Sequence, residues 1–258
     1  MNNNSILAIV FAFLGLIFGA LLAIFIQKKE EKFVKYAESL ASGFMLAVVF
    51  FDLMPNASQK ADFVTIFFGL LAGIVIILLI SQFSAREMYT KLPNYDIIKK
   101  DIKSESLQNK SSPQLDDKKR LVKNLTTAFA VALHNIPEGI ALGALDGQEI
   151  LISTAILIAL HNIPEGIAMS IPPAKIGIKW HKILLFAIIT GACTVVGWGI
   201  GILVGGISEQ FIAFMLAISS GAMLQIVFGD LIANNENKNC GNITLLGLLI
   251  GFVIATIV

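Results

Sequence analysis

The chain contains eight apolar runs, and each is long enough to cross a lipid bilayer as a helix. A membrane-spanning helix needs about 20 residues. Hydrophobic residues make up 56% of the 258 positions and charged residues only 14%, against about a quarter in soluble domains. The sequence therefore predicts an all-α, polytopic membrane protein with a single transmembrane domain over residues 1–258. The predicted helices cover residues 5–26, 37–56, 63–83, 122–145, 150–171, 183–205, 210–233 and 242–258.

Basic residues are distributed unevenly between the loops that join these predicted helices. Of the 19 lysines and arginines, 18 lie in every second loop, and only Lys60 lies in the alternate set. Cytoplasmic loops of membrane proteins collect lysine and arginine, so the lysine-rich loops are predicted to face the cytoplasm and both termini the outside. The longest of these loops, at about 84–120, is polar and predicts a flexible cytoplasmic linker.

The motif His-Asn-Ile-Pro-Glu-Gly occurs at 134–139 and again at 161–166, in the fourth and fifth predicted helices. On a helix, residues i and i+4 share a face, and residue i+1 lies about 100° around. Each copy therefore presents a histidine and a glutamate side by side, with the asparagine next to them. Two such helices facing each other would supply nitrogen and oxygen ligands suited to zinc or a neighbouring first-row metal. The candidate ligands are His134, Asn135, Glu138, His161, Asn162 and Glu165.

The same residues could instead join two helices by hydrogen bonds without holding a metal. A lone buried histidine would leave that alternative open. Here a carboxylate, which is costly at the centre of a bilayer, stands one helical turn from a histidine in both copies. The repeated cost favours a cation site. Pro137 and Pro164 lack an N–H group and predict a kink in each helix beside the site.

A second repeat links the second and seventh predicted helices, because residues 42–53 return at 220–231 with eight of twelve positions identical. With both termini outside, these helices run in opposite directions, as do the fourth and fifth. Inverted repeats around a midplane site are typical of secondary transporters, so we expect eight helices in a 3+2+3 arrangement with inverted repeats. The repeat places Asp52 near the outer end of its helix and Asp230 near the inner end of its own. Each would line a cation pathway or, alternatively, cap a loop at the membrane surface.

The paired motif, the eight spans, the outside termini and the long loop before the fourth helix together resemble the ZIP (Zrt/Irt-like) family of divalent metal transporters, especially its bacterial zinc-uptake (ZupT/GufA-like) branch. The resemblance implies that the six motif residues hold the transported metal, that Asp52 and Asp230 lie along its path, and that the protein is a homodimer. Many relatives carry a glutamate in the sixth helix that helps to form a second metal position. This chain has Thr194 there, so the sequence is compatible with either one or two bound metal ions.

The expected function is secondary transport of divalent cations into the cytoplasm, with zinc first and iron, manganese, cobalt or cadmium as further substrates. The expected partners are the metal cations and the lipid bilayer of a bacterial inner membrane. No cofactor and no nucleic acid are expected, and no GxxxxGK[ST] nucleotide motif occurs. One alternative is an intramembrane zinc hydrolase, although asparagine follows each motif histidine where a HExxH protease has glutamate. Another is a metal sensor that binds without transport.

Overall fold

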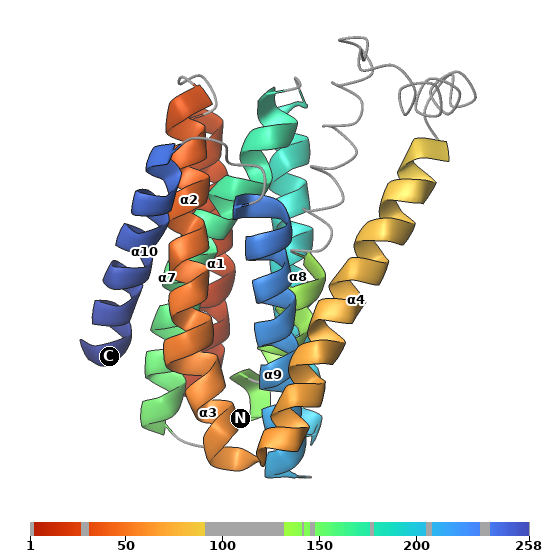
Figure 1. Cartoon of the computed structure of the whole chain (residues 1–258), viewed down its shortest axis with the longest axis vertical. Coiled ribbons are helices and arrows are strands. Elements are labelled where there is room, and N and C mark those ends of the chain that lie inside the picture. Colours follow the sequence, from red (N-terminus) through yellow and green to blue (C-terminus); the bar gives the residue numbers. More distant parts are fainter. Residues whose placement is uncertain are drawn as a thin grey trace.

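All regular structure that the computed structural model describes is helical (Figure 1). The described residues are 3–26, 31–90, 132–140, 142–144, 148–175, 178–204, 208–232 and 238–257. The helical residues 132–140 and 142–144 are called the His134 helix below. The other elements are α1 (Asn3–Ile26), α2 (Glu31–Val48), η1 (Val49–Leu53), α3 (Met54–Lys60), α4 (Phe63–Thr90), α7 (Gln148–Lys175), α8 (Trp180–Val204), α9 (Glu209–Ile226), η2 (Val227–Ile232) and α10 (Lys238–Ile257).

Six helices within the described residues are long and apolar enough to cross a membrane, which confirms the prediction of a multi-pass membrane protein. They cover Ile9–Ile26, Lys35–Lys60, Phe63–Gln82, Trp180–Val204, Glu209–Gly229 and Asn239–Thr256. Large apolar side chains such as Phe25, Phe63 and Leu203 are exposed on the outside of the bundle. Apolar side chains in such positions suit a lipid environment, because contact with lipid removes them from water.

Helices α1 and α7 pack so closely that backbone meets backbone. A methyl group built on Gly19 of α1 would lie 2.0 Å from the carbonyl oxygen of Ile163 in α7. The His134 helix and α8 make the same contact, since a methyl group on Gly197 would lie 2.2 Å from the carbonyl oxygen of Ile136. Gly197 follows Gly19 by 178 positions, and Ile163 follows Ile136 by 27. The offsets of the two sequence repeats therefore also relate these helix pairs in space.

A second set of helix pairs follows the same rule. A methyl group on Gly43 of α2 would lie 2.1 Å from the carbonyl oxygen of Thr244 in α10. One on Gly221 of α9 would lie 2.1 Å from the carbonyl oxygen of Leu70 in α4. Gly221 again follows Gly43 by 178 positions. Helices α2 and α9 are thus equivalent members of two pairs, each tied to a peripheral partner through a glycine.

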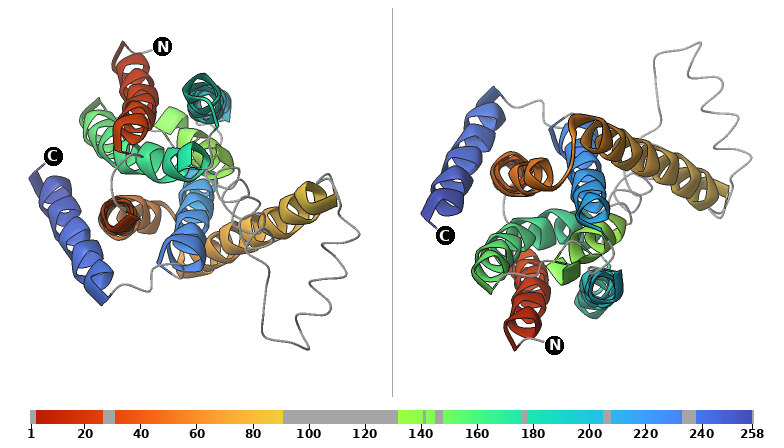
Figure 2. Two further views of the ribbon diagram at one scale, coloured as in Figure 1. Left: turned by 90° about the horizontal axis from the view of Figure 1, so that it is seen from above. Right: turned by 90° about the horizontal axis from the view of Figure 1, so that it is seen from below.

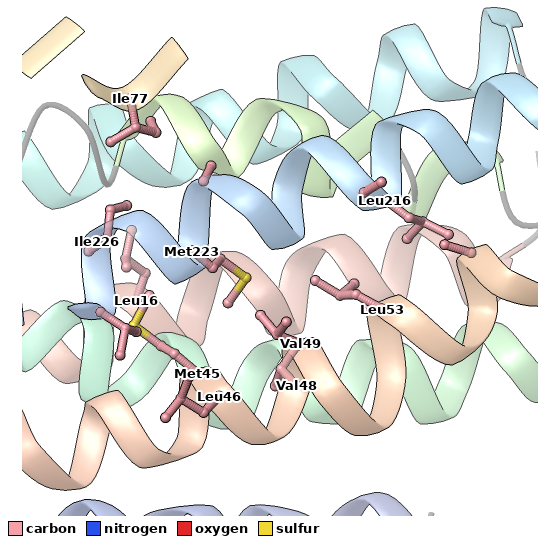
Figure 3. Packing of buried hydrophobic residues seen from close by; sticks show 14 of the residues in the cluster. Leu16, Met45, Leu46, Val48, Val49, Leu53, Ile77, Leu216, Met223 and Ile226 are labelled. Atoms are coloured by element: carbon pink, nitrogen blue, oxygen red, sulfur yellow. The ribbon is translucent and has the colours of Figure 1, made fainter. Parts of the chain in front are cut away.

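The buried apolar core lies where α2 and α9 meet, and it too is built from matched positions (Figure 3). Met45 and Met223 are both almost fully buried, as are Val48 and Ile226, and each pair is 178 positions apart.

Figure 2 shows α7 and the His134 helix near the middle of the bundle, with α1 and α8 on one side and α2 and α9 on the other. The two motif copies are therefore held centrally.

Both copies of the second repeat widen into π-helix at the same position. Segments η1 and η2 begin at Val49 and Val227, which are 178 positions apart. In η1 the N–H of Met54 donates to the carbonyl of Val49 five residues back. Pro55 accounts for the widened turn in part, because its ring clashes with a carbonyl four residues earlier. π-helical turns are rare and often lie at functional sites.

Several predicted boundaries lie at different positions in the structure. The helix expected to end at 56 continues through α3 to Lys60, so Asp52 lies two turns inside it rather than near its end. Helix α4 continues to Thr90, which moves the start of the predicted 84–120 linker; positions 91–131 fall outside the described residues. Helix α7 stays helical through Pro164. Figure 1 shows both ends of the chain in the lower half of the molecule.

Candidate metal site

The two motif copies bring their histidines and glutamates together in a ring. His134 Nε2 lies 3.9 Å from Glu138 Oε2 on its own helix and 3.7 Å from Glu165 Oε2 on α7. His161 Nε2 lies 3.6 Å from Glu138 Oε1 and 3.9 Å from Glu165 Oε2. Each imidazole therefore faces a carboxylate from each helix. Below, these four side chains are called the His–Glu ring.

The ring is sealed from solvent, and its carboxylates are short of hydrogen-bond donors within the described residues. Glu138 and Glu165 are each 1% exposed. Among the described residues, both oxygens of Glu138 and Oε2 of Glu165 have no hydrogen-bond donor. A buried carboxylate is strongly destabilising unless a positive charge or donors compensate it. A cation bound between the two helices would provide this compensation.

The side chains of the ring lie slightly farther apart than the ligands of one bound zinc ion would. Ligands of a tetrahedral zinc with bonds of about 2.0–2.1 Å lie about 3.3 Å apart. Consistent with this, no group of three or more His, Cys, Asp or Glu side chains in the described ranges is already drawn together at metal-binding spacing. The four distances between imidazole nitrogens and carboxylate oxygens, 3.6–3.9 Å, exceed this ligand spacing by about 0.3–0.6 Å.

The two motif asparagines have different partners, although their sequence surroundings are identical. The Nδ2 of Asn162 donates to the carbonyl oxygen of Ala12 in α1, at 3.0 Å. The Nδ2 of Asn135 instead faces Glu165 Oε1 at 3.4 Å. Both asparagines are buried, and the Oδ1 of each has no partner among the described residues. Asn162 thus ties α7 to α1, whereas Asn135 belongs to the polar surroundings of the ring.

Helix α8, which packs against the His134 helix, has two buried threonines. Thr190 and Thr194 are both buried, and Thr190 Oγ1 has no partner in the described part of the chain. A methyl group on Gly139 would lie 2.1 Å from the carbonyl oxygen of Thr194, which sets α8 directly against the motif helix. Sequence analysis singled out Thr194 but missed Thr190, for which the sequence gives no signal of its own.

Asp52 lies in η1, is 7% exposed, and interacts electrostatically with His161 and Glu138. The structure thus brings it toward the His–Glu ring. Asp230 lies in η2 at the matched position. Sequence analysis also missed Asn56, whose side chain contacts Asp52. His181, the remaining histidine, is exposed and contacts the ring of Trp180 in a T-shaped arrangement, away from the site.

Residues 4–258 match the sequence profile of the family described as ZIP zinc transporter. The chain belongs to the ZIP family. The zinc transporter ZupT of Clostridium perfringens is 28% identical over 99% of this chain and 95% of its own length. ZupT of Chlorobium limicola is 30% identical over 90% of this chain and 88% of its own. The zinc transporter GufA of Myxococcus xanthus is 31% identical over 52% of this chain and 54% of its own. These relatives confirm the predicted resemblance to the ZupT/GufA-like branch.

Membership of the ZIP family identifies the protein as a membrane transporter of divalent metal cations rather than an enzyme. The predicted alternative of an intramembrane zinc hydrolase is therefore not supported. The metal is the transported substrate and not a resident cofactor. Which residues of this ZIP protein hold the metal is a separate question, which depends on the geometry of the two motif helices.

Proposed function

We propose that this ZIP protein carries zinc into the cytoplasm through the His–Glu ring between the His134 helix and α7. The observation that carries the proposal is the pair of buried glutamates, each shared between two histidines and short of hydrogen-bond donors. Imidazole and carboxylate without thiolate favour zinc over softer metals and over magnesium or calcium. The names of the relatives, which are zinc transporters, support the same cation.

The proposed fold has eight membrane spans in a 3+2+3 arrangement. The first three are α1, the continuous α2–η1–α3 helix and α4; the middle two are the His134 helix and α7; the last three are α8, α9 with η2, and α10. Support comes from the close glycine contacts, which repeat with an offset of 178 between the outer groups and 27 within the middle pair. Such regularity is expected of an internally duplicated transporter.

The proposed orientation has both termini outside the cell, in a bacterial inner membrane. The lysine-rich loops then face the cytoplasm, as such loops usually do. In this orientation, the two copies of each repeat run in opposite directions. Zinc would enter past Asp52, bind in the ring and leave past Asp230. Family membership also makes a homodimer the expected assembly.

The packing supports transport by movement of one helix group against another. Glycine contacts tie α7 to α1 and the His134 helix to α8, so the ring belongs to a four-helix group with backbone-to-backbone seams. Separate glycine contacts tie α2 to α10 and α9 to α4. Groups of packed helices can shift as rigid bodies relative to one another in conformational transitions. A shift between the two groups would expose the ring first to one side of the membrane and then to the other.

The α8 side of the ring favours a single bound metal. Thr190 and Thr194 offer neutral hydroxyl groups at the buried face of α8, where a carboxylate would be needed to balance a second divalent cation. Two divalent cations beside only two glutamates would leave two uncompensated positive charges in a low-dielectric site. We therefore expect one zinc ion per chain at saturation.

Zinc uptake into liposomes tests the proposed site. His161→Ala should lower the initial rate of zinc entry at least about thirtyfold, because it removes a ligand from a four-ligand set. His181→Ala is the matched control, since this histidine is exposed and lies away from the ring. It should leave the rate within twofold of the unaltered protein. Equal rates for His161→Ala and the unaltered protein would show that the metal takes another route. Tight zinc binding without any flux would point to a sensor.

A further inference from the structure

Asp52 has a buried carboxylate whose two oxygens differ, because one accepts a hydrogen bond and the other has no partner among the described residues. It stands in the π-helical turn η1, is 7% exposed, and its Oδ2 has no hydrogen-bond partner among the described residues. Its carboxylate is within electrostatic range of His161 and Glu138. A carboxylate in this position lies near the ring without being part of it.

Asn56 holds the other oxygen of this carboxylate. Its Nδ2 donates to Asp52 Oδ1 at 2.8 Å and to the backbone oxygen of Asp52 at 3.0 Å. The two residues are one turn apart, so the bonds form within the helix that carries both. One amide that grips both the side chain and the backbone of Asp52 leaves the carboxylate little freedom to rotate. A donor to a carboxylate also stabilises the charged form.

The pairing of aspartate and asparagine recurs in the second copy of the repeat. Asp230 lies 178 positions after Asp52, and Asn234 lies 178 positions after Asn56. The matched segments η1 and η2 carry the two aspartates. The asparagine spacing therefore accompanies the aspartate in both halves of the chain, outside the twelve positions that first revealed the repeat.

We propose that Asn56 is a positioning residue for zinc transport, which fixes the Asp52 carboxylate so that Oδ2 receives the cation on its way to the His–Glu ring. The proposal rests on the proposed function, because it assumes that zinc passes Asp52. Asn56 itself does not touch the metal. Its effect is on capture of zinc at low concentration, since a carboxylate already held in one orientation binds without first losing rotational freedom.

A double-mutant cycle tests the proposal, with zinc uptake measured in liposomes that contain a zinc-sensitive dye. Asn56→Leu keeps the branched skeleton of four heavy atoms but has no amide, and should raise KM for zinc about three- to tenfold with the maximal rate within twofold. Asp52→Ala alone should raise KM at least as much. In protein that already carries Asp52→Ala, adding Asn56→Leu should change KM no further, because the residue through which Asn56 acts is gone. Asn56→Gln, which retains an amide, should restore part of the affinity.

Ser58→Ala is the matched control, because Ser58 lies on the same helix and its exposed hydroxyl group donates only to the carbonyl of Pro55. It should leave KM and the maximal rate unchanged. A merely structural role for Asn56 would instead lower the maximal rate and the melting temperature, or raise KM by the same factor with and without Asp52; either result overturns the proposal. If Asp52→Ala leaves KM unchanged while His161→Ala stops transport, the inference fails and the proposed function stands. If unaltered protein transports no zinc, both fail.

Discussion

Glu138→Ala is expected to abolish zinc transport, with a fall in the initial rate of at least about a hundredfold. Glu138 contacts both histidines of the ring, with Oε1 toward His161 and Oε2 toward His134. Its removal would take away a proposed ligand and also half of the negative charge that is proposed to compensate the cation. Removing one partner of a buried charged pair costs about 3–5 kcal/mol, which corresponds to a hundredfold or more in affinity.

Zinc entry into liposomes that contain a zinc-sensitive dye measures this effect, and equilibrium zinc binding to the purified protein separates loss of binding from loss of movement. Glu209→Gln is the matched control, because Glu209 is exposed and its carboxylate lies 3.9 Å from Lys60 outside the ring. It should transport at the normal rate. Should Glu138→Ala retain more than a tenth of that rate, Glu138 would not be a ligand of the transported metal.

The second large effect is expected at a glycine seam. Gly197→Ala would place a methyl group 2.2 Å from the carbonyl oxygen of Ile136 and 3.1 Å from Gly139 Cα. Because these neighbours are backbone atoms, the clash can be relieved only by moving α8 away from the His134 helix. Overpacking of this kind costs about 1–3 kcal/mol or more in well-packed interiors. We expect a lower melting temperature together with reduced transport.

Gly199→Ala provides a control two residues away on the same helix. No atom lies within 4 Å of a methyl group built there, and alanine favours helix over glycine by up to about 1 kcal/mol. Gly199→Ala should therefore match or slightly exceed the unaltered protein in thermal unfolding in detergent. Equal melting temperatures for the two variants would mean that the seam between α8 and the His134 helix can widen without cost.

Much of the fold could be predicted from apolar runs, since bilayer thickness constrains helix length directly. One exception is the helix that carries Asp52. Asn56, Ser58 and Lys60 lower the hydropathy after Pro55, and a proline usually ends a helix, so the sequence pattern predicts an end near 56. The structure continues because the π-helical turn η1 accommodates the altered hydrogen bonding ahead of Pro55. Local composition does not record such an adjustment.

The residue types of the candidate site could also be predicted from the sequence, because His, Asn and Glu recur at fixed spacing in two helices. The roles of Asn135 and Asn162 were not. Identical motifs predict identical roles, but α7 packs against α1, where the carbonyl of Ala12 accepts the amide of Asn162. The His134 helix packs against α8, and Asn135 faces Glu165 instead. Only the neighbouring helix distinguishes the two copies, and sequence spacing alone does not identify that neighbour.

The two glutamates of the His–Glu ring have an electrical consequence for the proposed transporter. With neutral imidazoles, two carboxylates and one divalent cation sum to zero charge, so the membrane potential does no work on the loaded ring as it moves. If both glutamates stay ionised when the metal has left, the empty ring would carry two negative charges, and an inside-negative potential of 100 mV would favour their outward return by about 4.6 kcal/mol. The membrane potential would therefore act on the return of the empty transporter rather than on the inward movement of the metal. A more negative potential inside the cell would raise the turnover rate only if that return is the rate-limiting step.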